Sequence, residues 1–410
     1  MDSVGEYDIV IGGGGMIGSC LALALAPLGL RIAVVEAVER QSAGQPSFDD
    51  RSTALSRSSQ RTFSALGLWP AISAAATPIT HIHVSDRGRF GFSHIDAAEQ
   101  QVAALGYVVI NRVLGAVLQE ALADIASIDV LCPSRITAVT TGVDTLDVSV
   151  EEQGRTRSLH CRLLVAADGA RSSVRDMLGI SSQHSDYGQQ AVIGNLQTER
   201  PLDNRAYERF TDGGPLAMLP IADGRAAFIW TLEPSQAETV IALPDDAFTA
   251  RLQDAFGFRL GRFSRVGIRA RYPLVLSKAL GLIAPRGVLV GNAAHGLHPV
   301  AAQGFNLGLR DVAALSECIA DSMAEGNRDP GHGALLERYA DWRRSDQRKL
   351  VGFTDGLVRL FGSRRPAVRL LRDAGMLGFD LVPGVRGLFA KHTMGLAGRL
   401  PRLSRGVPLR

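Results

Sequence analysis

Residues Tyr7–Glu36, YDIVIGGGGMIGSCLALALAPLGLRIAVVE, decide the fold of this chain. The apolar run Tyr7–Ile11 predicts a strand that ends in a glycine turn. A small-residue helix is expected over Met16–Leu28, and a second strand over Arg31–Glu36. Strand, helix and strand in this order indicate a βαβ unit. A glycine-rich turn between the first strand and the helix is typical of dinucleotide binding.

The glycine turn has the GxGxxG spacing. Its first glycine makes the turn, its second lets the backbone approach a pyrophosphate, and its third permits close contact between helix and strand. Five residues of this turn are therefore candidates for cofactor binding: Gly13, Gly15, Met16, Ile17 and Gly18. Glu36 ends the second strand, where its carboxylate can accept hydrogen bonds from ribose hydroxyls. The turn alone does not distinguish FAD from NAD.

Two further turns have a related form. The apolar run Leu163–Ala167 leads into Asp168–Arg175, where Ser172 is a favourable residue to cap a helix. The segment Gly287–Asp311, GVLVGNAAHGLHPVAAQGFNLGLRD, predicts a short strand, a small-residue turn and a helix that opens near Gly304. A helix that starts at the end of a strand can hold an anion. The three turns together predict a site for one long ligand.

The composition is that of a soluble globular protein. The 410 residues suffice for two to three domains, with 46% hydrophobic and 21% charged residues. The four cysteines form no CxxC pair, which argues against a disulfide framework or a metal site and favours a reducing compartment. No basic segment precedes the first apolar run, and no apolar run approaches the length of a membrane span. We expect a cytoplasmic protein with no nucleic-acid partner.

The net charge of +3 conceals an asymmetry. Residues 343–410 contain 15 Lys/Arg and 4 Asp/Glu, a local balance of +11, whereas the remainder has a balance of −8. A basic tail on an acidic body predicts contact with an anionic surface, which could be membrane headgroups or an acidic partner. The alternative is a solvated helical cap over the nucleotide-binding domain.

The pattern changes character along the chain. From Tyr187 to Ile241, short strand-like runs alternate with turns, which predicts an antiparallel sheet inserted into a nucleotide-binding domain. Asp245–Phe256 predicts a helix, and the pattern after Asp341 is mostly helical. We expect the nucleotide-binding domain at 1–80, 101–181 and 275–342, a substrate domain with a strand pair at 81–100 and a sheet at 182–274, and a basic helical region at 343–410.

Five separated segments carry a family resemblance. The Asp168–Arg175 segment resembles the Asp-Gly fingerprint of the flavin-dependent aromatic hydroxylases. Gly291-Asn292 stands where that family has Gly-Asp. Pro299 and Gln303–Leu307 match its next loop and helix start, whereas Ala302 stands where the family commonly has glycine. Together with SFDDRSTALS, HVSDRGRFG and ERFTDGGPLAMLP, these motifs resemble the ubiquinone-biosynthesis hydroxylases, and within them the 2-octaprenyl-6-methoxyphenol hydroxylase branch.

The resemblance implies fold and cofactor. The fold class is then α/β (α+β overall), a Rossmann-like FAD-binding domain with an inserted antiparallel-sheet substrate domain and a helical C-terminal region. Asn292 would bond the ribityl chain of FAD without the charge of the family's Asp. The resemblance adds further candidate FAD contacts: Arg51, Arg112, Asp168, Gln303, Gly304, Asn306 and Leu307. The position of Arg112 aligns equally well with Asn111.

The resemblance also implies a reaction. Reduced FAD would add O2 at its C4a carbon, and the distal oxygen of the hydroperoxide would pass to the ring of a polyprenylated phenol. The sequence has one full dinucleotide fingerprint, so NAD(P)H would bind transiently or a redox partner would supply electrons. We assign no catalytic acid or base, and we assign His295 a structural role. The predicted pocket wall consists of Phe210, Leu216, Met218, Pro220, Trp230, His298 and Pro299.

Two other functions remain open from the sequence. The chain could be an FAD-dependent reductase or oxidase of an isoprenoid lipid, or a non-catalytic subunit of a ubiquinone-biosynthesis complex that kept the FAD fold. Only a monooxygenase would insert an oxygen atom from O2 into its product. The three intact turns favour the monooxygenase.

Overall fold

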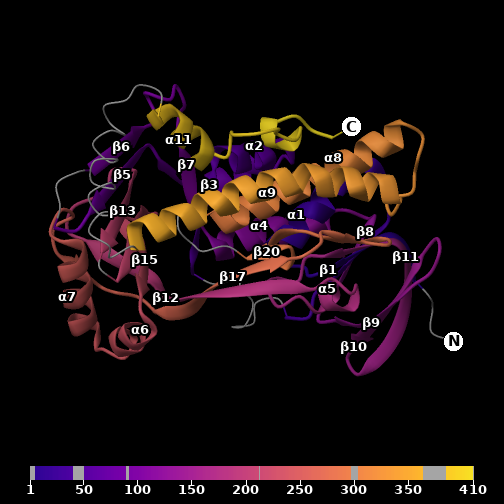
Figure 1. The fold of residues 1–410 in the computed structure, drawn as a ribbon, viewed down its shortest axis with the longest axis horizontal. Coiled ribbons are helices and arrows are strands. Elements are labelled where there is room, and N and C mark those ends of the chain that lie inside the picture. The colour runs from indigo at the N-terminus through magenta and orange to yellow at the C-terminus, as the bar shows by residue number, and fades with distance from the viewer. Residues whose placement is uncertain are drawn as a thin grey trace.

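The computed structural model describes residues 5–39, 50–88, 92–211, 213–296, 303–362 and 385–409. His298 and Pro299 lie outside these ranges, as does the Gln303 side chain. In Figure 1 the first sheet, with β1, β8 and β11, lies on the side of the molecule marked N. The second sheet, with β5, β6, β13 and β15, lies on the opposite side. The long strands β12 (Ser182–Thr198) and β17 (Ala270–Ala279) run between the two parts.

The first sheet has the parallel order expected of a nucleotide-binding domain. Its strands follow the order β18-β19-β11-β1-β2-β8, in which only β18 is antiparallel to its neighbour among the described pairs. An antiparallel hairpin of β9 and β10 extends the sheet beside β11. The bounds are β1 (Gly5–Gly12), β2 (Ile32–Val35), β8 (Ile128–Leu131), β9 (Arg135–Thr141), β10 (Leu146–Glu152), β11 (Arg155–Ala166), β18 (Ile283–Ala284) and β19 (Gly287–Leu289). The central strands read as continuous apolar runs because both of their faces are buried.

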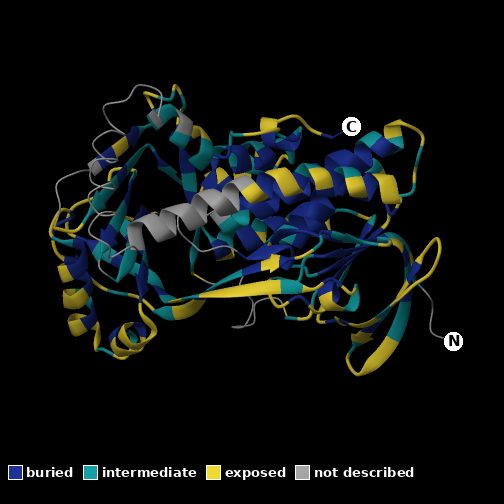
Figure 2. Cartoon of the chain, viewed as in Figure 1, coloured by how far each residue is buried: buried dark blue, intermediate teal, exposed yellow. Residues whose placement is uncertain are grey.

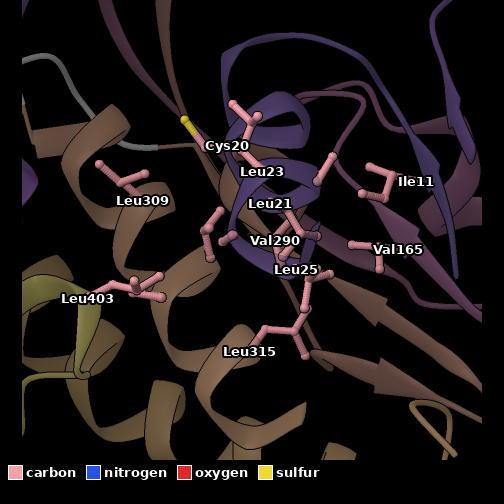
Figure 3. Close-up of a cluster of buried hydrophobic side chains, with 14 of the residues drawn as sticks. Ile11, Cys20, Leu21, Leu23, Leu25, Val165, Val290, Leu309, Leu315 and Leu403 are labelled. Atoms are coloured by element: carbon pink, nitrogen blue, oxygen red, sulfur yellow. The ribbon is translucent and has the colours of Figure 1, made fainter. Parts of the chain in front are cut away.

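Helices bury one face of this sheet. They are α1 (Met16–Leu25), α4 (Asn111–Ala123), α8 (Gln303–Ala324) and α9 (Gly333–Gly362). Figure 3 shows the centre of this core, where side chains of α1 lie between the strands and α8. Ile11, Val165 and Val290 come from the sheet, Cys20, Leu21, Leu23 and Leu25 from α1, and Leu309 and Leu315 from α8.

The second sheet is largely antiparallel, in the order β20-β17-β12-β15-β14-β13-β5-β6. Its further strands are β5 (His81–Asp86), β6 (Phe92–Asp96), β13 (Arg205–Thr211), β14 (Gly214–Pro220), β15 (Arg225–Leu232), β16 (Phe263–Ser264) and β20 (His295–Gly296). Only the β13–β5 pair is parallel among the described pairings of this sheet. The expected boundary at residue 274 falls inside β17, which continues to pair with β12 and then with β20.

The second sheet has two chemically distinct faces. Its outer face is covered by α6 (Pro234–Ile241) and α7 (Asp245–Phe256), which expose their own outer sides in Figure 2. The predicted bounds of α7 are confirmed. Its inner face packs against a small sheet of β3 (Ser52–Ser56), β7 (Gly106–Ile110) and β4 (Thr77–Ile79). The shorter helices are α2 (Arg57–Ala65), α3 (Trp69–Ser73) and α5 (Ser173–Met177), with 3-10 turns η1 (Ala26–Leu28), η3 (Gly291–Ala293) and η5 (Leu403–Arg405).

The described part of the basic C-terminal region contacts both the second sheet and the first domain. α11 (Val385–Thr393) lies near β6 and β7 in Figure 1, and its Ala390 packs with Ile95 and Leu105. Arg402 binds Asp321 of α8 at 2.6 Å, which neutralises part of the tail's charge within the chain. None of the described helices is long and apolar enough to cross a membrane.

Candidate cofactor and substrate site

Four strand ends form a row at one edge of the first sheet. β19, β11, β1 and β2 are neighbours in that order and run in parallel, so their carboxyl ends meet at the same edge. The three predicted turns and Glu36 follow these four strands. Adjacent strands are ~4.8 Å apart, so the row extends over about 14 Å. This arrangement suits one extended ligand.

The first turn is closely packed and has free donors. Gly13 has a φ of +106°, and a methyl group on Gly18 would stand 1.9 Å from the Gly13 carbonyl oxygen. The N-terminus of α1 has no side-chain cap, which leaves its backbone N–H groups for an anion. Glu36 accepts hydrogen bonds from the N–H groups of Gly14 at 2.7 Å and Val38 at 2.8 Å. The carboxylate is thereby fixed beside the turn with acceptor capacity to spare.

The second turn is held by its own carboxylate. Asp168 accepts hydrogen bonds from the Ser172 hydroxyl and from the Val174 N–H, the latter at 3.1 Å. Asp168 therefore caps the start of α5, and any contact with a cofactor would be additional to this role. The buried Arg175 donates to the carbonyl oxygens of Ala170 at 3.2 Å and Ala293 at 3.3 Å. Arg175, which no sequence pattern singled out, thus joins the second turn to the third.

The third turn packs directly against the first. Gly291 has a φ of +60°, and a methyl group there would come within 3.1 Å of Ile17. Asn292 is exposed on this turn, and none of the described residues hydrogen-bonds to its amide. Around Gly304, no described atom lies within 4 Å of where a methyl group would stand. Asn292 and the start of α8 are therefore accessible to a ligand.

Two predicted contacts at the start of α8 have structural roles. The Asn306 side chain accepts from the Ser56 N–H at 2.8 Å and donates to the Ala54 carbonyl at 2.9 Å. Leu307 is fully buried. Only the backbone of these two residues is suited to meet a cofactor.

A buried ionic network connects the third turn to α9. Asp311 is fully buried and accepts from the Gly291 N–H at 3.0 Å, His295 Nε2 at 2.6 Å and Arg343 Nε at 2.6 Å. Asp346 then binds Arg343 at 2.7 Å and Arg310 at 2.8 Å. The structural role predicted for His295 is confirmed. Arg343 has no local motif; its i, i+3 spacing to Asp346 is the one sequence signal that could have found it.

The positive partners of Asp311 keep its carboxyl group ionised. Burial alone would raise the pKa of Asp311, but His295 and Arg343 together hold it below its usual range. Asp311 therefore remains a carboxylate at neutral pH. Tyr339 of α9 also donates to the Leu289 carbonyl at 2.9 Å, so α9 is bonded to β19 just before the turn.

Two predicted cofactor contacts lie near the boundary between the domains. The Arg51 guanidinium stands 4.9 Å from the ring centre of Tyr272, on the inner face of the second sheet. Arg112 pairs with Asp50 at 3.2 Å on the surface, whereas Asn111 is buried and accepts from the Thr53 hydroxyl at 2.7 Å. Of the two alternatives, Arg112 is the more accessible to a phosphate.

The predicted pocket wall is wrong for four residues. Leu216, Met218 and Trp230 point to the outer face of the second sheet, where they form a closed core with α6 and α7. Pro220 lies on the same face, two residues beyond Met218. Their apolar character serves packing and not a substrate cavity. Phe210 is on the inner face. Tyr207 packs on the outer face, and residues an odd number of positions apart along a strand point to opposite faces.

Comparison with known proteins decides the family. A family model described as FAD binding domain matches residues 6–354. The chain belongs to the FAD-binding hydroxylase family. This hydroxylase is 38% identical over 405 residues to the ubiquinone hydroxylase UbiL of Rhodospirillum rubrum, covering 98% of this chain and 93% of that protein. It is 30% identical over 395 residues to the 3-demethoxyubiquinol 3-hydroxylase of Escherichia coli, covering 95% and 98%.

A solved structure shows the same fold. The p-nitrophenol 4-monooxygenase PnpA of Pseudomonas putida aligns with a TM-score of 0.80 at 19% identity, over 97% of this chain and all of that one. The protein is an FAD-dependent aromatic monooxygenase. The glycine cradle, the uncapped start of α1 and the Glu36 carboxylate fit the phosphates and the ribose of FAD.

Gly18→Ala is expected to impair FAD binding. The added methyl group cannot be accommodated beside the Gly13 carbonyl oxygen, so the turn must move. We expect affinity for FAD to fall at least tenfold, a loss of about 1.4 kcal/mol. Flavin absorbance per protein after gel filtration measures this. Gly333→Ala is the control, because no described atom lies within 4 Å of its added methyl group. Full FAD retention by Gly18→Ala would contradict the assigned cradle.

Asp311→Asn is expected to cost about 3–5 kcal/mol of unfolding free energy, because it leaves Arg343 buried and incompletely paired. Asp341→Asn removes the exposed pair with Arg344 and should cost less than about 1 kcal/mol. Urea unfolding at neutral pH compares the two variants.

The effect of Asp311 also has a defined pH dependence. Its pKa is depressed in the folded protein, so its stabilisation is present above the unfolded value of about 3.9 and is lost as pH falls through the folded value. The difference in unfolding free energy between the parent and Asp311→Asn should therefore become smaller at acidic pH. Equal destabilisation by Asp311→Asn and Asp341→Asn would show that the network does not support the fold.

Proposed function

We propose that this chain hydroxylates the aromatic ring of a polyprenylated, methoxylated phenol in ubiquinone biosynthesis, as in the 2-octaprenyl-6-methoxyphenol hydroxylase branch. The full-length similarity to two hydroxylases that act in ubiquinone synthesis carries the substrate class. The position of the row of strand ends, where FAD would bind, supports the reaction class. The inner face of the second sheet is directed toward the domain that carries this row. The cofactor contacts proposed are the turn residues, Glu36, Arg51, Arg112, Asp168, Asn292 and the backbone at the start of α8.

The residues of the chain divide the work with the cofactor. Bound FAD supplies the activation of O2 and the transfer of one oxygen atom. The first turn and Glu36 would hold and orient the cofactor, and the helix N–H groups at the start of α8 would stabilise negative charge on a reduced flavin. The apolar inner face of the second sheet, with Phe210, excludes water from the ring to be hydroxylated.

Product chemistry tests the function. Cells that lack this protein should lose ubiquinone and accumulate a phenolic precursor that lacks one ring hydroxyl. The purified holoenzyme with that precursor, a reductant and isotopically labelled O2 should form a product carrying one labelled oxygen. An oxidised or reduced product without label would make the protein an oxidase or a reductase. Restoration of ubiquinone by a variant that binds no FAD would make it a non-catalytic subunit.

We also propose that the basic tail meets an anionic surface near the substrate, at the inner membrane or on a biosynthetic complex. Arg343, Arg344 and Arg402 are paired within the chain, but Arg348, Lys391, Arg399 and Arg405 are exposed. An exposed cationic surface adds about 1 kcal/mol of attraction per residue near an anionic membrane.

Vesicle flotation tests the membrane part of this proposal. The full chain should float with anionic vesicles at low salt, and less so at high salt or with neutral vesicles. The double variant Lys391→Gln, Arg405→Gln should float several-fold less. Arg155→Gln in the β10–β11 hairpin is the matched control for an exposed cation. Flotation of the double variant equal to that of the parent would exclude this surface.

A further inference from the structure

Glu208 lies in the middle of β13 on the inner face of the second sheet. Its neighbours on the chain, Tyr207 and Arg209, point to the outer face, where Tyr207 packs in the α7 core. Ala206, which shares a face with Glu208, packs in the cluster that joins the second sheet to β4 and β7. The Glu208 carboxyl is therefore directed toward the side of the FAD-binding domain.

The surroundings of Glu208 are apolar. In register with it stand Ala217 on β14 and Val84 on β5. Glu208 is partly accessible, yet enough protein encloses it to raise the pKa of its carboxyl to about 7. Burial is the sole cause of this shift, and no described residue offers the carboxyl an ion pair or a hydrogen bond.

The three most deeply buried carboxylates of the described chain have cationic partners. Asp311 binds Arg343, Asp346 binds Arg343 and Arg310, and Glu317 lies near Arg402. An unpaired carboxylate in an apolar setting costs stability, so it indicates a group kept for a ligand. Ala217, opposite Glu208 on β14, presents only a methyl group on this face of the sheet.

We propose that Glu208 binds the phenolic hydroxyl of the substrate and takes up its proton during hydroxylation. The inference rests on the proposed function for the presence of a phenol. It assigns to this chain a catalytic residue for the reaction, on the sheet that faces the cofactor-binding domain.

The proton and electron balance is simple. The net reaction joins a phenol, O2, two electrons and two protons to give a hydroxyphenol and water, with FAD and its donor supplying the electrons. Transfer of the phenolic proton to Glu208 raises the electron density of the ring as its carbon forms the new C–O bond. That carbon then loses its hydrogen as a proton, and Glu208 returns a proton to the phenolic oxygen. A base with a pKa near neutrality suits both transfers.

Few ionisable groups share the inner side of the second sheet. Along its described strands they are Asp86, opposite Phe210, and toward the other end Arg225, Tyr272, Lys278 and His295. Arg51 faces Tyr272 from the small sheet, and Arg386, Lys391 and His392 belong to α11. None of these groups contributes to the pKa shift of Glu208.

Ligand binding without turnover tests the assignment. The FAD-loaded full chain is titrated with a short-chain prenylphenol and with its methyl ether, and the change in flavin absorbance gives both affinities. A hydrogen bond to a charged acceptor predicts that the parent prefers the phenol by about 10- to 100-fold. Glu208→Leu should bring this ratio close to one, with FAD content unchanged. Glu238→Gln, on exposed α6, should keep the parent ratio.

The pH dependence gives a second measurement. The affinity of the parent for the phenol should rise through pH of about 7 and then level off, because the ionised carboxylate is the stronger acceptor. Glu208→Gln should show no such step. A parent ratio near one, or a Glu208→Leu protein that prefers the phenol as the parent does, overturns the assignment. The proposed function is judged separately, by whether labelled oxygen enters the product.

Discussion

The buried carboxylate of Asp311 is the constraint on which the cofactor site depends. It binds the backbone of the Gly291 turn, the ring of His295 and the guanidinium of Arg343. Taking these charges out of water is costly, so the network is tolerated only because each charge has an opposite partner. The third turn is thus positioned by a helix that begins more than forty residues later in the chain.

The same logic extends to the rest of the row. Arg175 bonds the second turn to the third, and Ile17 fills the space beneath Gly291 and Gly308. The three turns are therefore one mechanical unit, although they come from three distant parts of the sequence. A shift at any of them would be transmitted to the others through close packing and not through flexible side chains.

Local patterns were sufficient for the first βαβ unit, for the strands that lead into the second and third turns, for the start of α8 and for α7. Glycine spacing, apolar runs and cap residues determine structure over a few neighbouring positions, so they can be recognised in the sequence without knowledge of the fold. Local patterns were not sufficient to predict which side chains of β14 face the cofactor domain. The alternation of Leu216, Ala217 and Met218 is plain in the sequence, but which face meets the cofactor domain depends on where α6 and α7 pack. Likewise, nothing near Arg343 reveals that its partner is Asp311, because their contact is set by the crossing of α8 and α9.

The parallel sheet has a consequence for biosynthesis. Its central strand β1 emerges from the ribosome first, but β11 follows only after residue 155 and β19 only after residue 287. The arginines that secure the last turn are translated later still. A nascent chain therefore exposes its glycine turn long before it has a place to retain a flavin, and cofactor loading belongs to the late stage of folding. Truncated translation products that lack α9 would be apoproteins, whatever the integrity of their dinucleotide motif.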